Sequence, residues 1–392
     1  MLVLFSINHP SQYHMFKHLA RKIIDSGGSV FFFIQDRGMI ERLVQADGYE
    51  YSFSTSPGLR TMLQGKYSIV LRSFISVTQQ ELRIFWYNIF HKVDFMLGCD
   101  IAIAHVGFLM RRKAWVFTDD DYVFTRQYCH IAYPFAQHIV APFVADTHKW
   151  TYKKIGYLGT QKSAYLHPDY FVPDEAVLDK YNLRDTRFFI IRLVSFVALH
   201  DSLHGASTGI SESVLGRIIP LLKAKGKIII SLEGGDRDKY QEFVMKIDPT
   251  DMHSLLYYAD MLIGDSQSMQ VEAALLGTPA IRSNKWVLSK HKVNVIHYLE
   301  TKYGMCYSIS PLDEDGIVNR VEQLLDAGIK AQWKILREKF FAENTNLTDF
   351  LFWITSKYPV NYKKYMTKKD IIKEFVYNEK NSDGSGSQTP VY

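Results

Sequence analysis

The chain has 392 residues, which is enough for two domains that each bury a substantial core. Its formal net charge is only +5 at pH 7 and it has no dense basic run, so we expect no nucleic-acid partner. The three cysteines, Cys99, Cys129 and Cys306, are far apart in the sequence and odd in number, so they predict neither a metal site nor a disulfide framework. We therefore expect the protein in the reducing cytoplasm.

Short apolar runs alternate with amphipathic segments through the first part of the chain. The predicted strands cover residues 2–7, 29–34, 49–53, 100–105 and 114–119. A helix containing Met15 to Ile24 follows the first strand, and another over 39–46 follows the second. The alternation predicts a parallel sheet with right-handed crossovers. The first turn between strand and helix lacks the G-x-G-x-x-G pattern, so NAD binding is not predicted.

A second alternating region begins after residue 186. Predicted strands cover 187–193, 227–233, 261–263 and 278–281, and helices cover 315–327, 330–342 and 346–358. We therefore predict an α/β protein with two doubly wound domains that face a cleft. The expected units are 1–155, 156–345, a helical segment 346–378 that packs back on the first domain, and a disordered tail 379–392.

The segment 255–280 carries most of the functional information. The apolar run Met261–Ile263 is too short for a helix and suits a buried parallel strand. Asp265, Ser266 and Ser268, which are residue types favoured at helix N-caps, predict a helix that starts directly after it. A strand that leads into a helix N-terminus presents free backbone N–H groups, which bind anions. Glu272 lies one turn after Ser268. Serine caps occur in many proteins that bind nothing, but a carboxylate inside the apolar run 269–276 needs donors.

The sequence GDSQSMQVEAALLGTPAIR (264–282) resembles the nucleotide-sugar-binding segment of GT-B-fold proteins. These include the non-hydrolysing UDP-N-acetylglucosamine 2-epimerases and the N-acetylglucosaminyltransferase that makes lipid II. Longer segments, among them VFTDDD and YLGTQKSAYLHPDYFVPDEAVLDKYNL, are similar to the domain-of-unknown-function family three-five-four, from residue 1 to about residue 310. The resemblance implies two Rossmann-like domains and a UDP-linked nucleotide sugar as the substrate, with no separate cofactor.

The resemblance also implies roles for residues of the second domain. Ser266 matches a serine that contacts phosphate, and Glu272 matches a glutamate that binds ribose hydroxyls. Residues 253–255 align with a stretch whose backbone reads the base, and a capping role for Asp251 and His253 is the alternative. The epimerases have Ser-Gly-Gly where this chain has Ser266-Gln267-Ser268.

Three more charged residues of this domain are candidates from their positions alone. Arg192 lies inside an apolar strand and needs an acidic partner or an anionic ligand. Arg282 ends the strand after the motif helix and allows the same two interpretations. Glu233 belongs to a turn at a strand's carboxyl end, where ordinary turn chemistry is the competing explanation.

Catalytic candidates come from the first domain. His14 opens the first helix, matches a histidine in the family's H-x-F-K-like segment, and could take a proton from an acceptor hydroxyl. Asp119, Asp120 and Asp121 end a predicted strand at the cleft edge, where clustered carboxylates raise one another's pKa and suit acid or base roles. A structural histidine and helix-capping aspartates are the alternatives.

Three functions remain open from the sequence. The favoured one is a glycosyltransferase that uses a UDP-type donor in surface polysaccharide or glycan synthesis, with a glycan or lipid-linked acceptor. The second is a UDP-N-acetylglucosamine 2-epimerase, although the H-x-E-A-G-like signature of those enzymes is absent at 117–121. The third is a non-catalytic nucleotide-sugar-binding protein. A homodimer and peripheral contact with the inner membrane face are left open.

Overall fold

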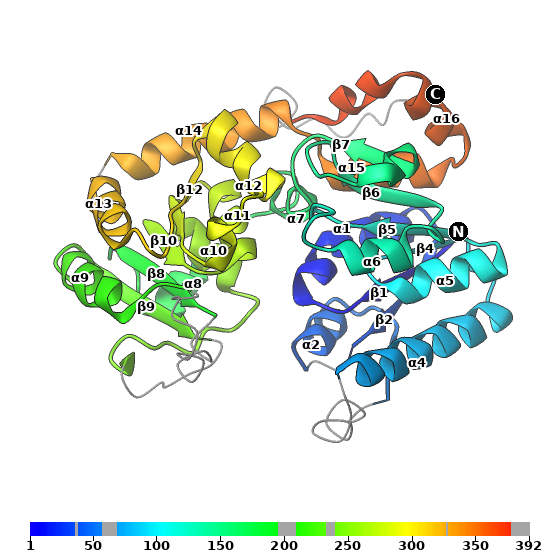
Figure 1. Cartoon of the computed structure of the whole chain (residues 1–392), viewed down its shortest axis with the longest axis horizontal. Coiled ribbons are helices and arrows are strands. Elements are labelled where there is room, and N and C mark those ends of the chain that lie inside the picture. Colours follow the sequence, from blue (N-terminus) through cyan, green and yellow to red (C-terminus); the bar gives the residue numbers. More distant parts are fainter. Residues whose placement is uncertain (36–37, 57–68, 195–208, 233–239, 327, 378–392) are drawn as a thin grey trace.

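The computed structural model describes residues 1–392 except 36–37, 57–68, 195–208, 233–239, 327 and 378–392. Two parallel sheets lie side by side, each covered by helices on both faces (Figure 1). The first sheet has the strand order β3-β2-β1-β4-β5-β6-β7 and the second has the order β12-β11-β10-β8-β9. Every pair of neighbouring strands is parallel.

The strands are short and most of their residues are buried, as expected for sheets covered on both faces. The first sheet contains β1 (Leu2–Ile7), β2 (Ser29–Ile34), β3 (Tyr51–Phe53), β4 (Phe95–Gly98), β5 (Lys113–Phe117), β6 (His138–Pro142) and β7 (Lys154–Tyr157). The second contains β8 (Phe188–Leu193), β9 (Lys227–Leu232), β10 (Met261–Gly264), β11 (Ala280–Arg282) and β12 (Cys306–Ser308).

Helices connect most of the consecutive strands, because parallel strands need a crossover connection. Those of the first domain are α1 (Pro10–Asp25), α2 (Gly38–Ala46), α4 (Ile69–Phe90), α5 (Ile101–Met110), α6 (Arg126–Ala132) and the 3-10 helix η1 (His148–Lys153). The connection to the second sheet contains α7 (Ser163–Leu166) and α8 (Ala176–Lys180). The second domain contains α9 (Glu212–Lys223), α10 (Met252–Tyr258), α11 (Gln267–Leu275), η5 (Lys285–Leu288), α12 (Asn294–Tyr298), η6 (Leu299–Tyr303), α13 (Glu314–Leu324) and α14 (Ile329–Glu343).

The last described segment returns to the first domain. Helix α14 runs from the second domain toward the first, and α15 (Leu347–Ser356), α16 (Val360–Thr367) and η7 (Lys369–Phe375) follow it there (Figure 1). Helix α15 packs on α1, and Lys22 of α1 forms an ion pair with Asp349 at 2.5 Å. The Tyr365 hydroxyl of α16 accepts from the Gly156 amide at 2.8 Å and donates to its carbonyl oxygen at 3.0 Å.

One predicted strand is wrong. Residues 101–105 begin helix α5, and the strand of this unit is β4, which ends before Asp100. Asp100 caps the helix, because its Oδ1 accepts from the amide of Ile103 at 3.1 Å. The Ile-Ala-Ile-Ala alternation resembles that of a strand, but the consecutive residues Ala102, Ile103 and Ala104 are all buried in the first turns of this helix, so the apolar residues there do not form a helical stripe.

Within the described residues, none of the helices combines the length and the apolar character that crossing a membrane requires. The predicted tail, 379–392, lies outside the described residues.

Candidate functional site

The strand orders place a candidate site at one edge of each sheet. In the first sheet the order reverses between β1 and β4, and in the second between β8 and β10. Doubly wound sheets bind ligands outside the carboxyl ends of the strands at such switch points. The residues after β1 and after β10 are those that the sequence singled out.

Helix α11 starts directly at the end of β10. A Cβ on Gly264 would lie 2.4 Å from the Arg192 carbonyl oxygen, so only glycine allows this close approach of β10 and β8. Ser266 is the N-cap, and its hydroxyl accepts from the Met269 amide at 3.4 Å. Ser268 is half-buried in the first turn. The helix therefore directs its N-terminal amides to the switch point, as an anion site requires.

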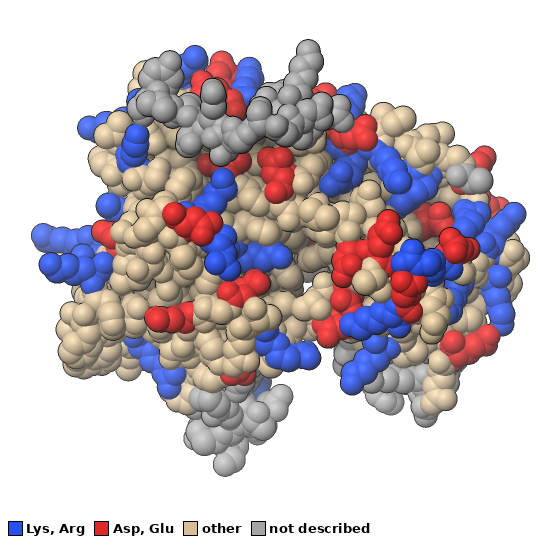
Figure 2. Space-filling view, turned by 180° about the vertical axis from the view of Figure 1, so that it is seen from behind, with Lys and Arg blue, Asp and Glu red and all other residues tan. Residues whose placement is uncertain are grey.

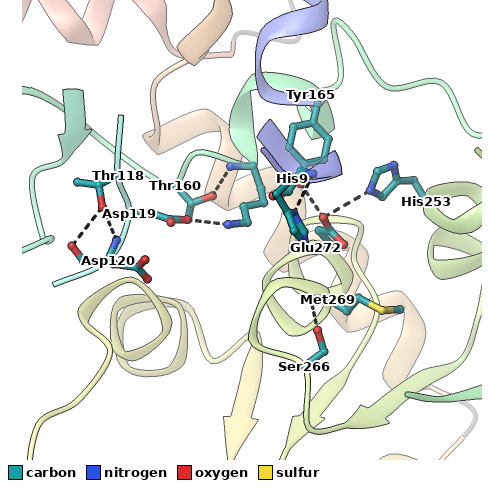
Figure 3. A network of polar contacts seen from close by, with 12 residues as sticks. His9, Thr118, Asp119, Asp120, Thr160, Tyr165, His253, Ser266, Met269 and Glu272 are labelled. Atoms are coloured by element: carbon teal, nitrogen blue, oxygen red, sulfur yellow. Dashed lines mark hydrogen bonds and ion pairs between the residues drawn. The ribbon is translucent and has the colours of Figure 1, made fainter. Parts of the chain in front are cut away.

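Glu272 is buried in α11 and is held by residues from two other helices. Its Oε1 accepts from the Tyr165 hydroxyl of α7 at 2.6 Å and lies 3.5 Å from Nε2 of His253 of α10. Figure 3 shows both side chains directed at the carboxylate. Burial alone would raise the pKa of Glu272, but His253, Tyr165 and the charge of Lys162 hold it below its usual value. The carboxylate is therefore ionised and has the donors that its burial demands.

His14 of α1 reaches this cluster from the first domain. Its ring centroid lies 4.9 Å from that of His253 and 5.5 Å from that of Tyr165. Burial and then the nearby His253 lower the pKa of His14 well below its usual value, so its imidazole is neutral near pH 7. Among the residues that the structure describes, no group is hydrogen-bonded to the buried Nδ1 of His14.

The aspartates after β5 occupy three different environments. Asp119 accepts from Nζ of Lys162 at 2.7 Å, and this ion pair is largely buried (Figure 3). Desolvation and repulsion from Asp119 raise the pKa of Asp120 to about 6, although its side chain reaches the surface. The charge of Lys162 also interacts with that of Glu272, so the Lys162–Asp119 ion pair lies near the group formed by Glu272, His253 and His14.

Asp121 joins the two domains. Its carboxylate accepts from the Asp146 amide at 2.7 Å and from the backbone and side-chain nitrogens of Asn294, both at 2.8 Å. Burial, partly offset by these donors, raises its pKa. Helix α6 has Thr125 at its N-cap, so none of the three aspartates caps it.

The predicted arginines lie at the carboxyl ends of their strands. Nη1 of Arg192 donates to the Ser231 hydroxyl at 2.6 Å, and Nη2 of Arg282 donates to that of Ser308 at 2.8 Å. Arg282 is buried, and within the described part of the chain its Nε and Nη1 have no hydrogen-bond partner. Burial lowers its pKa, which an anion beside it would reverse. Glu233 lies outside the described residues.

Sequence reasoning missed three residues of this site, namely Tyr165, Lys162 and Asn294. The first two belong to the stretch 162–173, which the sequence identifies only as an ordered connection. Nothing in its periodicity distinguishes them, because α7 is a single turn. One signal could have identified Lys162 and Tyr165: polar and aromatic residues occur in a connection that passes from the switch point of one sheet to that of the other.

Solved structures of similar shape support the architecture. The MnaA–UDP complex of S. aureus has a TM-score of 0.64 at 12% identity, covering 93% of this chain and 96% of that one. The UDP-GlcNAc 2-epimerase of Neisseria meningitidis bound to UDP-GlcNAc has a TM-score of 0.59 at 12% identity, covering 86% and 94%. MurG of Acinetobacter baumannii has a TM-score of 0.53 at 14% identity, covering 91% and 99%. These similarities show the fold, which is GT-B: two Rossmann-like domains.

No curated protein matches the sequence. A family model does match it, over residues 3–342, and therefore over most of both domains. The chain belongs to the family described as "Protein of unknown function (DUF354)".

Proposed function

We propose that the protein binds a UDP-type nucleotide sugar between its two domains. The observation that carries the proposal is the meeting of His14 from the first domain with His253 and Glu272 from the second. The diphosphate would lie at the N-terminus of α11, near Ser266 and the two nitrogens of Arg282 that have no partner among the described residues. Glu272 would accept from the ribose hydroxyls through Oε2, since the described contacts fall on Oε1.

The reaction that we favour is transfer of the sugar to an acceptor hydroxyl during surface polysaccharide or glycan synthesis. His14 would take the proton of that hydroxyl, because a neutral imidazole can act as a base and its Nδ1 has no partner in the described part of the chain. The departing diphosphate would be stabilised by the α11 amides and by Arg282. Asp120, with a pKa of about 6, could act as a second acid or base near Lys162.

Two alternatives use the same binding site. In a 2-epimerase the sugar would be inverted at C2 by elimination and re-addition of the nucleotide, which needs acid and base groups such as Asp119 and Asp120. The epimerases among the similar structures support this candidate. A non-catalytic protein would need Glu272 and Ser266 but no group at His14.

Removing the charge of Glu272 tests the binding site. Glu272→Gln should weaken UDP by about 1–3 kcal/mol, because a buried charge-assisted hydrogen bond is lost. Isothermal titration calorimetry gives the affinity, and Glu322→Gln, on the exposed face of α13, should bind UDP like the wild type. Equal UDP affinity in wild type and Glu272→Gln would remove the ribose assignment.

One incubation separates the three functions. The protein receives labelled UDP-N-acetylglucosamine without an acceptor, and NMR follows the sugar. Inversion at C2 supports the epimerase, slow release of UDP supports the transferase, and binding without turnover supports the non-catalytic protein. His14→Gln should abolish turnover and spare UDP binding, whereas the exposed His297→Gln should retain both. Full turnover in His14→Gln would exclude it as the base.

A further inference from the structure

Helix α4 buries two amide side chains beside the apolar Ile84 and turns other apolar residues to the solvent. Gln80 and Asn88 are only 4% and 2% exposed, and their amides donate to the Ser6 hydroxyl and the Ile84 carbonyl oxygen. On the opposite face, Trp86 is 56% exposed and Phe90 is 75% exposed. A helix on the surface of a water-soluble domain normally has the reverse arrangement. The outer face of α4 is therefore suited to contact with something less polar than water.

The neighbouring helix enlarges this surface. Helices α4 and α5 pack together, and both end at the amino edge of the first sheet, where Phe95 of β4 pairs with Lys113 of β5. The end of α5 adds Phe108 and Leu109, and Leu109 is 71% exposed. We define the apolar patch by six exposed apolar residues in the C-terminal parts of the two helices: Leu82, Trp86, Ile89, Phe90, Phe108 and Leu109.

Basic residues border the apolar patch. His91 and Lys92 directly follow α4, Arg111 directly follows α5, and all three are exposed at the same edge. The nearby acidic groups have partners: Glu81 contacts His105 at 2.6 Å, and Asp94 accepts from the Leu2 amide at 2.8 Å.

The charge distribution of the molecule is uneven. Figure 2 shows the molecule from behind, where charged side chains of both signs gather on the second domain, at the right, and the lower left is mostly uncharged on this face. At the border of the apolar patch itself, the exposed Lys92 and Arg111 carry positive charge and the exposed Asp94 carries negative charge.

We propose that the apolar patch docks onto a bilayer surface that contains anionic phospholipid. Apolar side chains would enter the boundary between headgroups and acyl chains, Trp86 would lie at headgroup level, and Lys92 and Arg111 would contact the phosphates. A second copy of the chain is the weaker candidate. A two-fold dimer would pair the patch with itself, so both sides of the interface would carry the same basic border and neither would supply a complementary acidic one.

Vesicle co-sedimentation of the full chain tests this proposal. The wild type should sediment with vesicles of phosphatidylcholine mixed with phosphatidylglycerol, less with phosphatidylcholine alone, and less as salt increases. Trp86→Glu combined with Phe90→Glu should reduce the bound fraction on the order of tenfold, because a carboxylate opposes insertion and repels anionic lipid. Leu312→Glu combined with Ile335→Glu alters exposed apolar residues of the second domain and should bind like the wild type.

A second variant acts on charge alone. Lys92→Ser combined with Arg111→Ser should lose the preference for phosphatidylglycerol, and it carries the test if the Trp86/Phe90 variant does not fold. The proposal is overturned if the wild type binds neither vesicle type. It is equally overturned if the Leu312→Glu/Ile335→Glu variant loses as much vesicle binding as the Trp86→Glu/Phe90→Glu variant. It is also overturned if the wild type binds no vesicles but forms a dimer that the Trp86/Phe90 variant does not form. UDP affinity, measured in parallel, should be unchanged in every variant.

Discussion

Glu272 shows how far single residues can be interpreted from the sequence. A carboxylate inside an apolar run must have donors, and residue type and neighbours are enough to predict this. The donors themselves, Tyr165 and His253, are 107 and 19 positions away, so their identity depends on how the helices pack. The same holds for His14, whose proximity to His253 brings residues of the two domains together.

Buried histidines should make the stability of the protein sensitive to acid. His138, at the start of β6, is 7% exposed, and burial lowers its pKa to about 4. The unfolded imidazole binds a proton below about pH 6.5 while the folded one does not, so stability falls as the pH drops below that value. His138→Gln should reduce the loss of unfolding free energy between pH 7 and pH 5 by about 1–2 kcal/mol, measured by urea titration.

The exposed His291 provides the control for this prediction. His291→Gln should leave the pH dependence unchanged, because this side chain is exposed and the substitution alters no buried group. If His138→Gln lost as much unfolding free energy between pH 7 and pH 5 as the wild type, the assignment of a buried neutral imidazole would be contradicted.

Single elements were predictable where their ends carry local signals. Helix α11 has Ser266 as its N-cap and ends just before Gly277, as the residues at its two ends predicted. The strand predicted at 100–105 was wrong because the alternation of isoleucine and alanine suits either a strand or the buried first turns of a helix. In that case only packing decides, since β4 already supplies the strand and Asp100 caps the helix that comes after it.

Two glycines in the second domain give a matched test of element stability. Gly277 has a φ of +74°, so Gly277→Ala should destabilise the protein by about 1 kcal/mol, because a left-handed conformation strains alanine. Gly216 lies inside α9 with open space around it, so Gly216→Ala should stabilise by about 0.5–1 kcal/mol. Urea unfolding measures both, and equal effects of the two substitutions would contradict the left-handed requirement at the end of α11.

At the scale of the molecule, the C-terminal helices belong physically to the first domain. Phe350, Leu351 and Ile354 of α15 are fully buried beside α1. A chain that ends at residue 345 should therefore expose this apolar surface, aggregate in size-exclusion chromatography and unfold at lower urea concentration. A chain that ends at residue 378 should behave like the full chain. A monodisperse and equally stable 1–345 chain would show that the return helices are dispensable.

The sequence alone determined the alternation of strands and helices, the division into two doubly wound domains, and the α11 segment with its buried carboxylate. These features depend on periodicity and capping, which act over a few neighbouring residues. Only the tertiary structure decided that His14 meets His253 and Glu272, that Lys162 pairs with Asp119, and that α4 leaves its apolar face uncovered. Such juxtapositions join residues far apart in the chain, and packing of whole helices and sheets sets them.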